Sequence, residues 1–419
     1  MKAALAGLLA AGLLCAAPAA AQTPYVVIAP EPPGRGVCPD GLCQPQALEP
    51  LFKALAAMEA GSRQTPVHIL QIGDSHTAGD RISGKVRADL QRRFGRGGRG
   101  ALPPGVPYDG YAPLQVTVAA RGWVMETAPL QPPAGAPSPR VGLSGVRATS
   151  TRDALMAFDL EPGSEASVLG VCGREGADNK GLSIEAGGVG REMRLGADEV
   201  CRRMTLPDGV RQVRLLALGD GAVVDSVWLN RVGTGVSLSS LGRVGATLRD
   251  LASRDETTVA AELNAWSPGL IILAFGTNEG FDGALDASGY ETLLRAQIAR
   301  LRRLAPDAAL MILGAPDALR NGAMNGCSVD RLRAPPPGLA VVRDVQGRVA
   351  ADLGVAFWDW HGRMGGDCSA DRLALRGEPF MRSDRVHFTN AGADWIGGVL
   401  SADLLTAYDA WTAAQAGAE

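Results

Sequence analysis

The clearest pattern along the chain is a set of four short apolar runs, each with the length of a buried strand. They are VHILQIG (67–73), GLIILAFG (269–276), ALMILGAP (309–316) and VAFWDW (355–360). Continuous apolar runs are typical of parallel strands that are covered on both faces. Three other segments, 80–95, 290–304 and 391–411, carry apolar residues at helical intervals. This alternation predicts an α/β domain built on a parallel sheet.

The middle of the chain has a different pattern. From about residue 108 to residue 229, long helical patterns are absent, and short alternating runs such as VRQVRLLAL (210–218) are separated by Gly-rich turns. This predicts an all-β module inserted in a loop of the α/β domain. The expected division is signal peptide 1–21, N-terminal lead and helix 22–64, first part of the α/β domain 65–107, β module 108–229 and second part of the α/β domain 230–419.

The N-terminus has the pattern of a secretory signal peptide. Lys2 precedes an Ala/Leu-rich run, and Ala19 and Ala21 fit an A-x-A cleavage site before Gln22. We therefore expect a periplasmic or secreted protein with no stable membrane insertion after cleavage. An uncleaved membrane anchor is the alternative, although the run is Ala-rich and barely long enough to span a bilayer.

The cysteines fit an oxidising compartment. Six remain besides Cys15, and an even number is typical of disulfide-bonded exported proteins. Proximity in the sequence predicts the pairs Cys38–Cys43, Cys172–Cys201 and Cys327–Cys368. None of the spacings is C-x-x-C, which argues against a structural zinc site.

Two polar segments carry the residues of a nucleophile and a base. Ser75 lies just after the run 67–73, at the end of a predicted strand, where open α/β sheets bind ligands. Asp384 precedes His387 by three residues on a predicted loop. Its carboxylate can therefore accept the Nδ1 proton and leave Nε2 free to act as a base.

Two further residues could stabilise an oxyanion. Asn278 follows the run 269–276, so its side-chain amide lies at the end of another predicted strand and could donate a hydrogen bond. Gly245 allows a backbone N–H to approach a substrate without interference from a Cβ atom. Nearby glycines, Gly233, Gly235 and Gly242, are alternatives to Gly245.

Four motifs in this order resemble the four blocks of the SGNH (GDSL) hydrolase superfamily. They are GDS (73–75), a glycine at Gly245, GTN (276–278) and D-x-x-H (384–387). The resemblance implies a flavodoxin-like, three-layer parallel sheet and ester hydrolysis without a metal or another cofactor. It assigns Ser75 as the nucleophile, His387 as the general base and Asp384 as the group that orients His387. The backbone N–H groups of Ser75 and Gly245 and the side chain of Asn278 form the implied oxyanion hole.

Longer segments resemble the bacterial peptidoglycan O-acetylesterases within this superfamily. They are QIGDSHTAGD (71–80), AFGTNEG (274–280), FWDWHGRMGG (357–366) and SDRVHFTNAGADWIG (383–397). Some of those enzymes carry a carbohydrate-binding β-sandwich between the first two blocks, where this chain has its predicted β module. The resemblance implies an acetylated glycan, peptidoglycan, as the partner and removal of acetyl groups from the C6 hydroxyl of N-acetylmuramic acid. The tryptophans that could offer flat surfaces to sugars are Trp123, Trp228, Trp358 and Trp360.

Several other functions are compatible with parts of the pattern. Another acetylated polysaccharide, such as a xylan-like glycan, could be the substrate, and acetyl transfer passes through the same acyl-serine as hydrolysis. A non-catalytic glycan-binding protein could keep the same fold. A two-metal phosphoesterase needs more ligands than four histidines provide. Nucleic acid is disfavoured because the net charge is −3 and no basic stripe is present.

Overall fold

The computed structural model of the chain describes residues 32–131, 137, 139–178 and 180–417. The predicted signal peptide, 1–21, lies outside the described residues. The elements below belong to the unit that begins at Pro33. Among the described residues, no helix combines the length and apolar character needed to cross a membrane.

A six-stranded sheet forms the centre of the α/β domain. Its order is β1-β17-β14-β13-β2-β12. The strands are β1 (Leu42–Cys43), β2 (Val67–Gly73), β12 (Val236–Gly242), β13 (Leu270–Ala274), β14 (Ala309–Leu313) and β17 (Ala356–Trp358). Apart from β1, the strands are parallel and lie side by side in the order β12-β2-β13-β14-β17. Counted along the chain, this is the order 2-1-3-4-5 of a flavodoxin-like sheet, as the resemblance of the four motifs implied. The sheet as a whole is mixed, because β1 runs antiparallel to β17 at one edge.

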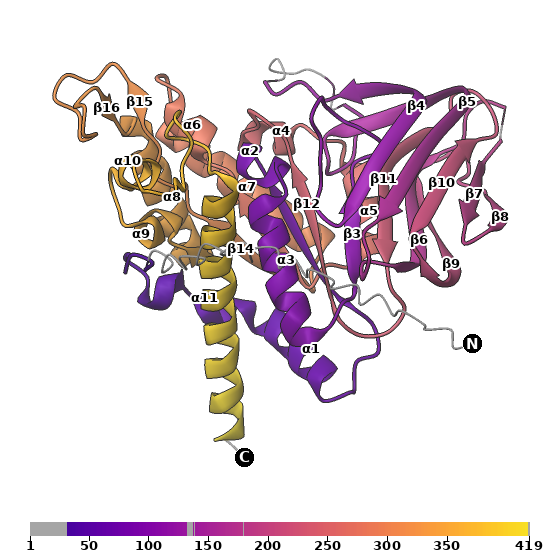
Figure 1. Ribbon diagram of the computed structural model, residues 1–419, viewed down its shortest axis with the longest axis horizontal. Coiled ribbons are helices and arrows are strands. Elements are labelled where there is room, and N and C mark those ends of the chain that lie inside the picture. Colours follow the sequence, from indigo (N-terminus) through magenta and orange to yellow (C-terminus); the bar gives the residue numbers. More distant parts are fainter. Residues whose placement is uncertain (1–31, 132–136, 138, 179, 418–419) are drawn as a thin grey trace, which may run out of the picture. The chain divides into compact units, whose positions relative to one another are not determined.

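Helices cover both faces of this sheet, because neighbouring residues of a strand point to opposite sides. Ile69 packs into one core and Leu70 into the other. The first core is closed by α1, α3, α9, α10 and α11, and the second by α4, α5, α7 and α8. Figure 1 shows α1, α3 and α11 side by side, in agreement with their contacts. The domain therefore has three layers.

The helices have the following bounds. They are η1 (Pro39–Gly41), η2 (Pro45–Leu48), α1 (Glu49–Glu59), α2 (Ser75–Ala78), α3 (Arg81–Phe94), α4 (Leu248–Ala252), α5 (Glu256–Trp266), α6 (Thr277–Phe281), α7 (Ala287–Leu304), α8 (Pro337–Leu353), α9 (Trp360–Met364), α10 (Ser369–Ala374) and α11 (Asn390–Ala416). A small hairpin is formed by β15 (Arg320–Asn321) and β16 (Arg333–Ala334).

The inserted segment forms a nine-stranded hydrogen-bonded sheet around a core of its own. Its strands are β3 (Gly98–Leu102), β4 (Val116–Thr127), β5 (Val146–Leu160), β6 (Ala166–Arg174), β7 (Leu182–Ala186), β8 (Val189–Met193), β9 (Val200–Val210), β10 (Gln212–Ala217) and β11 (Val223–Asn230). An additional β-rich module is therefore present, as predicted. Its sheet begins earlier than the expected boundary at residue 108, because β3 pairs with β11.

The cysteine pairs are those predicted from proximity. Disulfides join Cys38 to Cys43, Cys172 to Cys201 and Cys327 to Cys368. Disulfides of this kind persist in oxidising compartments, so they fit a periplasmic or extracellular protein.

The tryptophans of the segment 357–366 do not form a surface for sugars. Trp358 is fully buried and Trp360 is 3% exposed. Trp358 Nε1 donates to Asp403 Oδ2 at 2.8 Å, which ties β17 to α11. These two side chains belong to the core, in the buried cluster that also contains residues of α10 and α11.

The carboxylate of Asp80 links the α/β domain to the β module. It accepts hydrogen bonds from Arg87 Nη2 at 2.9 Å, Arg99 Nη2 at 2.7 Å and the Leu114 backbone N–H at 2.9 Å. Both arginine side chains are fully buried. Burial alone raises the pKa of Asp80, but the charges of Arg87 and Arg99 outweigh it and hold the pKa below its ordinary value. Three segments are therefore joined by one charged group.

Replacing Asp80 with alanine should lower the free energy of unfolding by about 3–5 kcal/mol, because two buried guanidinium groups lose their anionic partner. Urea denaturation at pH 7, followed by tryptophan fluorescence, measures this loss. Because the pKa of Asp80 is lowered, its contribution is present above the unfolded-state value of 3.8 and disappears as the pH falls through the folded-state pKa. The exposed Asp109, replaced in the same way, is the control and should change stability by less than about 0.5 kcal/mol.

Candidate active site

Three neighbouring strands end at the same level of the sheet. In the hydrogen-bonded register, Gly73 of β2 is paired with Gly242 of β12 on one side and with Ala274 of β13 on the other. The segments that leave these ends carry Ser75, Gly245 and Asn278 within four residues. The carboxyl ends of parallel strands are where open α/β sheets bind ligands.

A sharp turn presents Ser75 at this edge. Gly73 has no room for a side chain, since a Cβ atom would lie 2.4 Å from both the Ala274 carbonyl oxygen and Thr77 Oγ1. Asp74 then caps α2 by accepting the His76 backbone N–H at 2.9 Å. Ser75 is the first residue of α2 and is partly exposed, so its hydroxyl is accessible to a substrate.

The structure brings Ser75, His387 and Asp384 into one hydrogen-bonded series. Ser75 Oγ lies 3.0 Å from His387 Nε2, and His387 Nδ1 lies 2.8 Å from Asp384 Oδ2. The backbone N–H groups of Val386 and His387 donate to Asp384 Oδ1 at 2.9 and 3.0 Å. These contacts fix the carboxylate, which in turn fixes the ring with Nε2 facing the serine. A nucleophile, a base and an orienting group are thus in contact.

The Asp384 carboxylate is held in its charged form. Burial raises its pKa, but the N–H donors of His387 and Val386 and the imidazole of His387 outweigh that effect, so the pKa lies below its ordinary value. An ionised carboxylate accepts the His387 Nδ1 proton. It can therefore stabilise the positive charge that develops on His387 when the ring takes a proton from Ser75.

His76 supports the loop that carries His387, which the sequence did not indicate. Its Nδ1 lies 3.1 Å from Asp74 Oδ1 and its Nε2 lies 2.9 Å from the Val386 carbonyl oxygen. Both neighbouring atoms are hydrogen-bond acceptors, an arrangement that favours a ring with protons on both nitrogens. Burial lowers the pKa of His76, but the charge of Asp74 and the two hydrogen bonds outweigh it and raise the pKa. His76 therefore joins the turn of Ser75 to the residue beside His387.

Gly245 and Asn278 line a common cavity of about 520 Å³. Gly245 has a φ of +77°, a left-handed conformation that glycine adopts without strain. The Asn278 side-chain nitrogen donates one hydrogen to the Ala246 carbonyl oxygen at 2.8 Å, which leaves its second hydrogen for another acceptor. Ser75 and His387 do not line this cavity. The loop of Ser75 and the loop of Gly245 are connected at the strand ends, where the Arg243 backbone N–H donates to the Gly73 carbonyl oxygen at 3.0 Å.

The alternatives to Gly245 occupy other places. Gly233 and Gly235 precede the amino end of β12, which is the end away from Ser75. Gly242 is packed against the turn that carries Ser75, since a Cβ atom there would lie 2.1 Å from the Ala78 nitrogen. Gly245 therefore stays the proposed oxyanion donor.

Glu279 connects the two loops that carry Gly245 and Asn278. Its Oε1 accepts the Leu248 backbone N–H at 2.7 Å, and the side chain is buried beside the cavity. Burial raises the pKa of Glu279 to about 7, although the Leu248 N–H partly opposes this.

One group in the described part of the chain has the residue types and spacing of a metal site. Ligand atoms of Asp317, His361 and Asp367 all lie within 4.8 Å of one another. His361 Nε2 is already 2.8 Å from Asp367 Oδ1, and Arg343 Nη2 lies 3.6 Å from the same oxygen. The arginine balances part of the negative charge that would attract a cation. None of these residues belongs to the Ser75 series.

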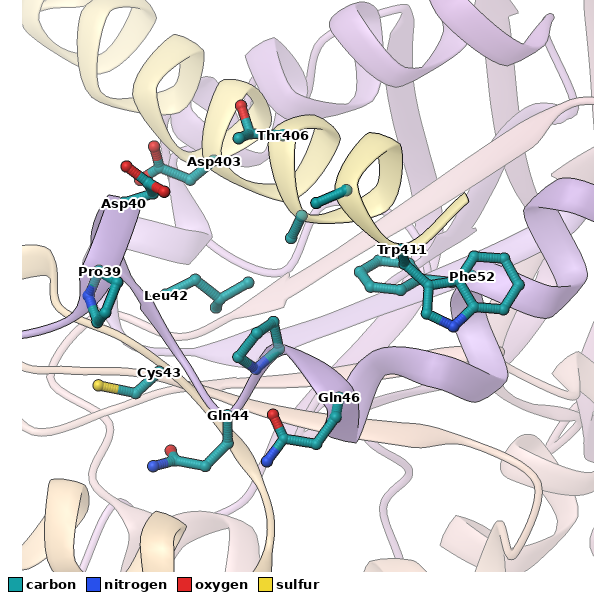
Figure 2. A pocket seen from close by; sticks show the side chains of 13 residues that line it. Pro39, Asp40, Leu42, Cys43, Gln44, Gln46, Phe52, Asp403, Thr406 and Trp411 are labelled. Carbon is teal, nitrogen blue, oxygen red and sulfur yellow. The ribbon is translucent and has the colours of Figure 1, made fainter. Parts of the chain in front are cut away.

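A separate apolar cavity of about 550 Å³ lies between α11 and the segment that contains β1 and the start of α1. Figure 2 shows Phe52 and Trp411 at one end and Asp40 and Asp403 at the other. The Asp403 carboxylate already accepts hydrogen bonds from Trp358 Nε1 and from Arg363 Nε, the latter at 2.9 Å. None of the predicted site residues lines this cavity.

Comparison with known proteins agrees with the geometry. Residues 219–395 match the model of the GDSL-like lipase/acylhydrolase family. A solved structure described as a peptidoglycan O-acetylesterase in action superposes with a TM-score of 0.75 at 24% identity, covering 88% of this chain and 99% of that chain. Residues 219–395 therefore have the pattern of the GDSL-like family, and the chain as a whole has the fold of the superposed structure. The superfamily predicted from the four motifs is thereby confirmed, and the match supports a serine esterase.

Two other solved structures superpose with much lower TM-scores. The acetyl xylan esterase AlAXEase is 17% identical, with a TM-score of 0.31 over 40% of this chain and 80% of that chain. A family two carbohydrate esterase from Cellvibrio japonicus is 12% identical, with a TM-score of 0.28 over 70% of this chain and 98% of that chain. Among curated proteins, none matches the chain.

Replacing His76 with glutamine should reduce kcat about ten- to a hundred-fold, because the loop beside His387 loses a fixed donor and the base shifts from Ser75. The stability of the variant relative to the native protein also depends on pH. Since the pKa of His76 is raised, its stabilising effect is fully present below the unfolded-state value of 6.5 and is lost as the pH rises through the folded-state pKa. Denaturation at pH 6 and pH 9 should therefore show a larger deficit at pH 6. An equal deficit at both values would contradict a cationic His76.

Proposed function

We propose that this protein is an exported serine esterase that removes O-acetyl groups from a polysaccharide, with the C6 hydroxyl of N-acetylmuramic acid in peptidoglycan as the favoured position. The contact of 3.0 Å between Ser75 Oγ and His387 Nε2 carries the proposal, because it supplies a nucleophile with its base. The likeness in fold to a structure described as a peptidoglycan O-acetylesterase supports the choice of leaving group and polymer.

In the first half of the reaction, Ser75 Oγ attacks the carbonyl carbon of the acetyl ester while His387 Nε2 takes the hydroxyl proton. Asp384 stabilises the resulting imidazolium through the 2.8 Å contact to Nδ1. The carbonyl oxygen becomes an oxyanion. Its proposed donors are the backbone N–H groups of Ser75 and Gly245 and the second N–H of the Asn278 amide. Collapse of the tetrahedral intermediate expels the sugar hydroxyl, which receives the proton from His387.

In the second half, water attacks the acetyl-serine. His387 Nε2 takes a proton from the water, the same donors stabilise the second oxyanion, and acetate leaves as Ser75 recovers its proton. No redox step and no additional group is needed. A sugar hydroxyl in place of water would give acetyl transfer, which is the alternative reaction, and release of acetate without an acceptor sugar distinguishes the two.

The proposed substrate is tested by acetate release from O-acetylated peptidoglycan and from acetylated xylan, measured at equal acetyl concentration. We expect peptidoglycan to be the better substrate by kcat/KM. Ser75→Ala should remove at least about 10³-fold of the activity on both, with an unchanged circular dichroism spectrum. A large preference for xylan would overturn the polymer assignment alone. Full activity of Ser75→Ala would overturn the esterase mechanism.

Replacing Asn278 with alanine should lower kcat about 10²- to 10³-fold with a small effect on KM, because the amide acts on the oxyanion rather than on the ground-state ester. Initial rates with 4-nitrophenyl acetate separate the two constants. Thermal unfolding is the control, since the contact to the Ala246 carbonyl oxygen is also lost. A change confined to KM would exclude an oxyanion role.

A further inference from the structure

A second large cleft lies at the opposite end of β2 from Ser75. It has a volume of about 940 Å³ and is bordered by the β module, through β9 and β11, and by the α/β domain, through Pro66, His68 and the end of α5. Figure 1 shows α5 near these strands, and Cys201 Sγ of β9 lies 3.5 Å from the Ala261 carbonyl oxygen of α5. The seven residues of β2 separate the cleft from Ser75 by roughly 20 Å.

The cleft is strongly positive. Arg63, Arg202, Arg203 and Arg231 line it, whereas Glu199 is the one acidic residue among the lining residues. That carboxylate is already paired with Arg147 Nη2 at 2.8 Å and Arg174 Nε at 3.2 Å. In a chain whose net charge is −3, four lining arginines with so little opposing charge form a local concentration of positive potential.

Three of the four arginines are held in ways that leave their charge available. The Arg63 guanidinium donates to the backbone carbonyl oxygens of Thr65 and Pro66, which are neutral. Arg203 lies over the ring of Trp228 at 5.8 Å, an arrangement that positions a guanidinium without neutralising it. Arg231 is exposed. Its ion pair with Glu165 is long, at 4.0 Å, and therefore neutralises little of the charge of Arg231.

The remaining lining suits a sugar polymer more than a simple anion. The indole N–H groups of Trp228 and Trp266 have no hydrogen-bond partner within the described part of the chain, although both side chains are buried. Asn264 and Ser267 add exposed polar side chains at the rim. Hydroxyl and carboxylate oxygens of a sugar can accept from the Asn264 amide, the Ser267 hydroxyl and the arginines.

We propose that this cleft binds a carboxylate-bearing glycan segment, as a second site for the polymer that is deacetylated at Ser75. The choice of polymer rests on the proposed function, whereas the binding of an acidic glycan rests on the cleft itself. Since the two sites are at opposite ends of β2, a glycan that occupies both must be a chain of several sugars. The cleft would then hold the polymer while acetyl groups are removed elsewhere along it.

The test measures binding in the Ser75→Ala background with soluble peptidoglycan strands whose acetyl groups have been removed by mild alkali. Calorimetry should give an affinity that falls with added salt. The double variant Arg203→Ser/Arg231→Ser should weaken binding about tenfold or more, as expected for the loss of two charged donors. The matched control is Arg121→Ser/Arg152→Ser, which removes two exposed arginines from β4 and β5 and should leave the affinity unchanged.

Three outcomes would overturn the inference. They are equal weakening in both double variants, equally tight binding of an uncharged chitin oligosaccharide, or binding of inorganic phosphate as tight as that of the strands. With Ser75 intact, the Arg203/Arg231 variant should hydrolyse 4-nitrophenyl acetate at the native rate and act more slowly on the acetylated polymer. A protein that binds acidic strands through the cleft but releases no acetate would remove the esterase proposal and leave this site standing.

Discussion

The arrangement of the active site depends on one constraint, the hydrogen-bonded register in which β2, β12 and β13 end together. Gly73 is paired with both Gly242 and Ala274, so the three segments that leave the sheet begin at one level. Because a parallel ladder fixes each strand against the next, a shift of one residue in β12 or β13 would turn every following side chain to the other face. The nucleophile and the proposed oxyanion donors therefore share a rigid base and need few contacts with one another.

Buried charged groups near this edge of the sheet also help to position the active-site residues. Asp80 holds two arginines and the start of the module, while His76 holds the loop of the base. Each lies within five positions of Ser75 in the sequence. The segment after β2 is thus more than a nucleophile motif, since it also carries the contacts that position the partners of that nucleophile.

Much of this could be predicted because the relevant signals are local. The runs 67–73 and 269–276 are apolar throughout, and Ser75, Asn278 and His387 each lie beside a strong pattern. The strand β12 escaped prediction because Ser237, Ser239 and Ser240 interrupt its apolar character. These hydroxyls have distant partners, such as His68 Nε2 at 2.7 Å from Ser239 Oγ. The role of His76 depends on its contact with Val386, 310 positions away. A contact between residues so far apart produces no periodic pattern in the sequence.

The two crossings between the α/β domain and the module are bonded to each other. Gly97 N donates to the Val236 carbonyl oxygen at 3.0 Å, and Arg231 N donates to the Gly97 carbonyl oxygen at 3.0 Å. His68 and Ser239, on adjacent strands, are 171 positions apart, yet the folded module brings its own ends together. When the module is folded, most of the entropy cost of closing this long loop has already been overcome. This favours a folding order in which the module forms first and β2 then pairs with β12 as if the two strands were consecutive in the sequence.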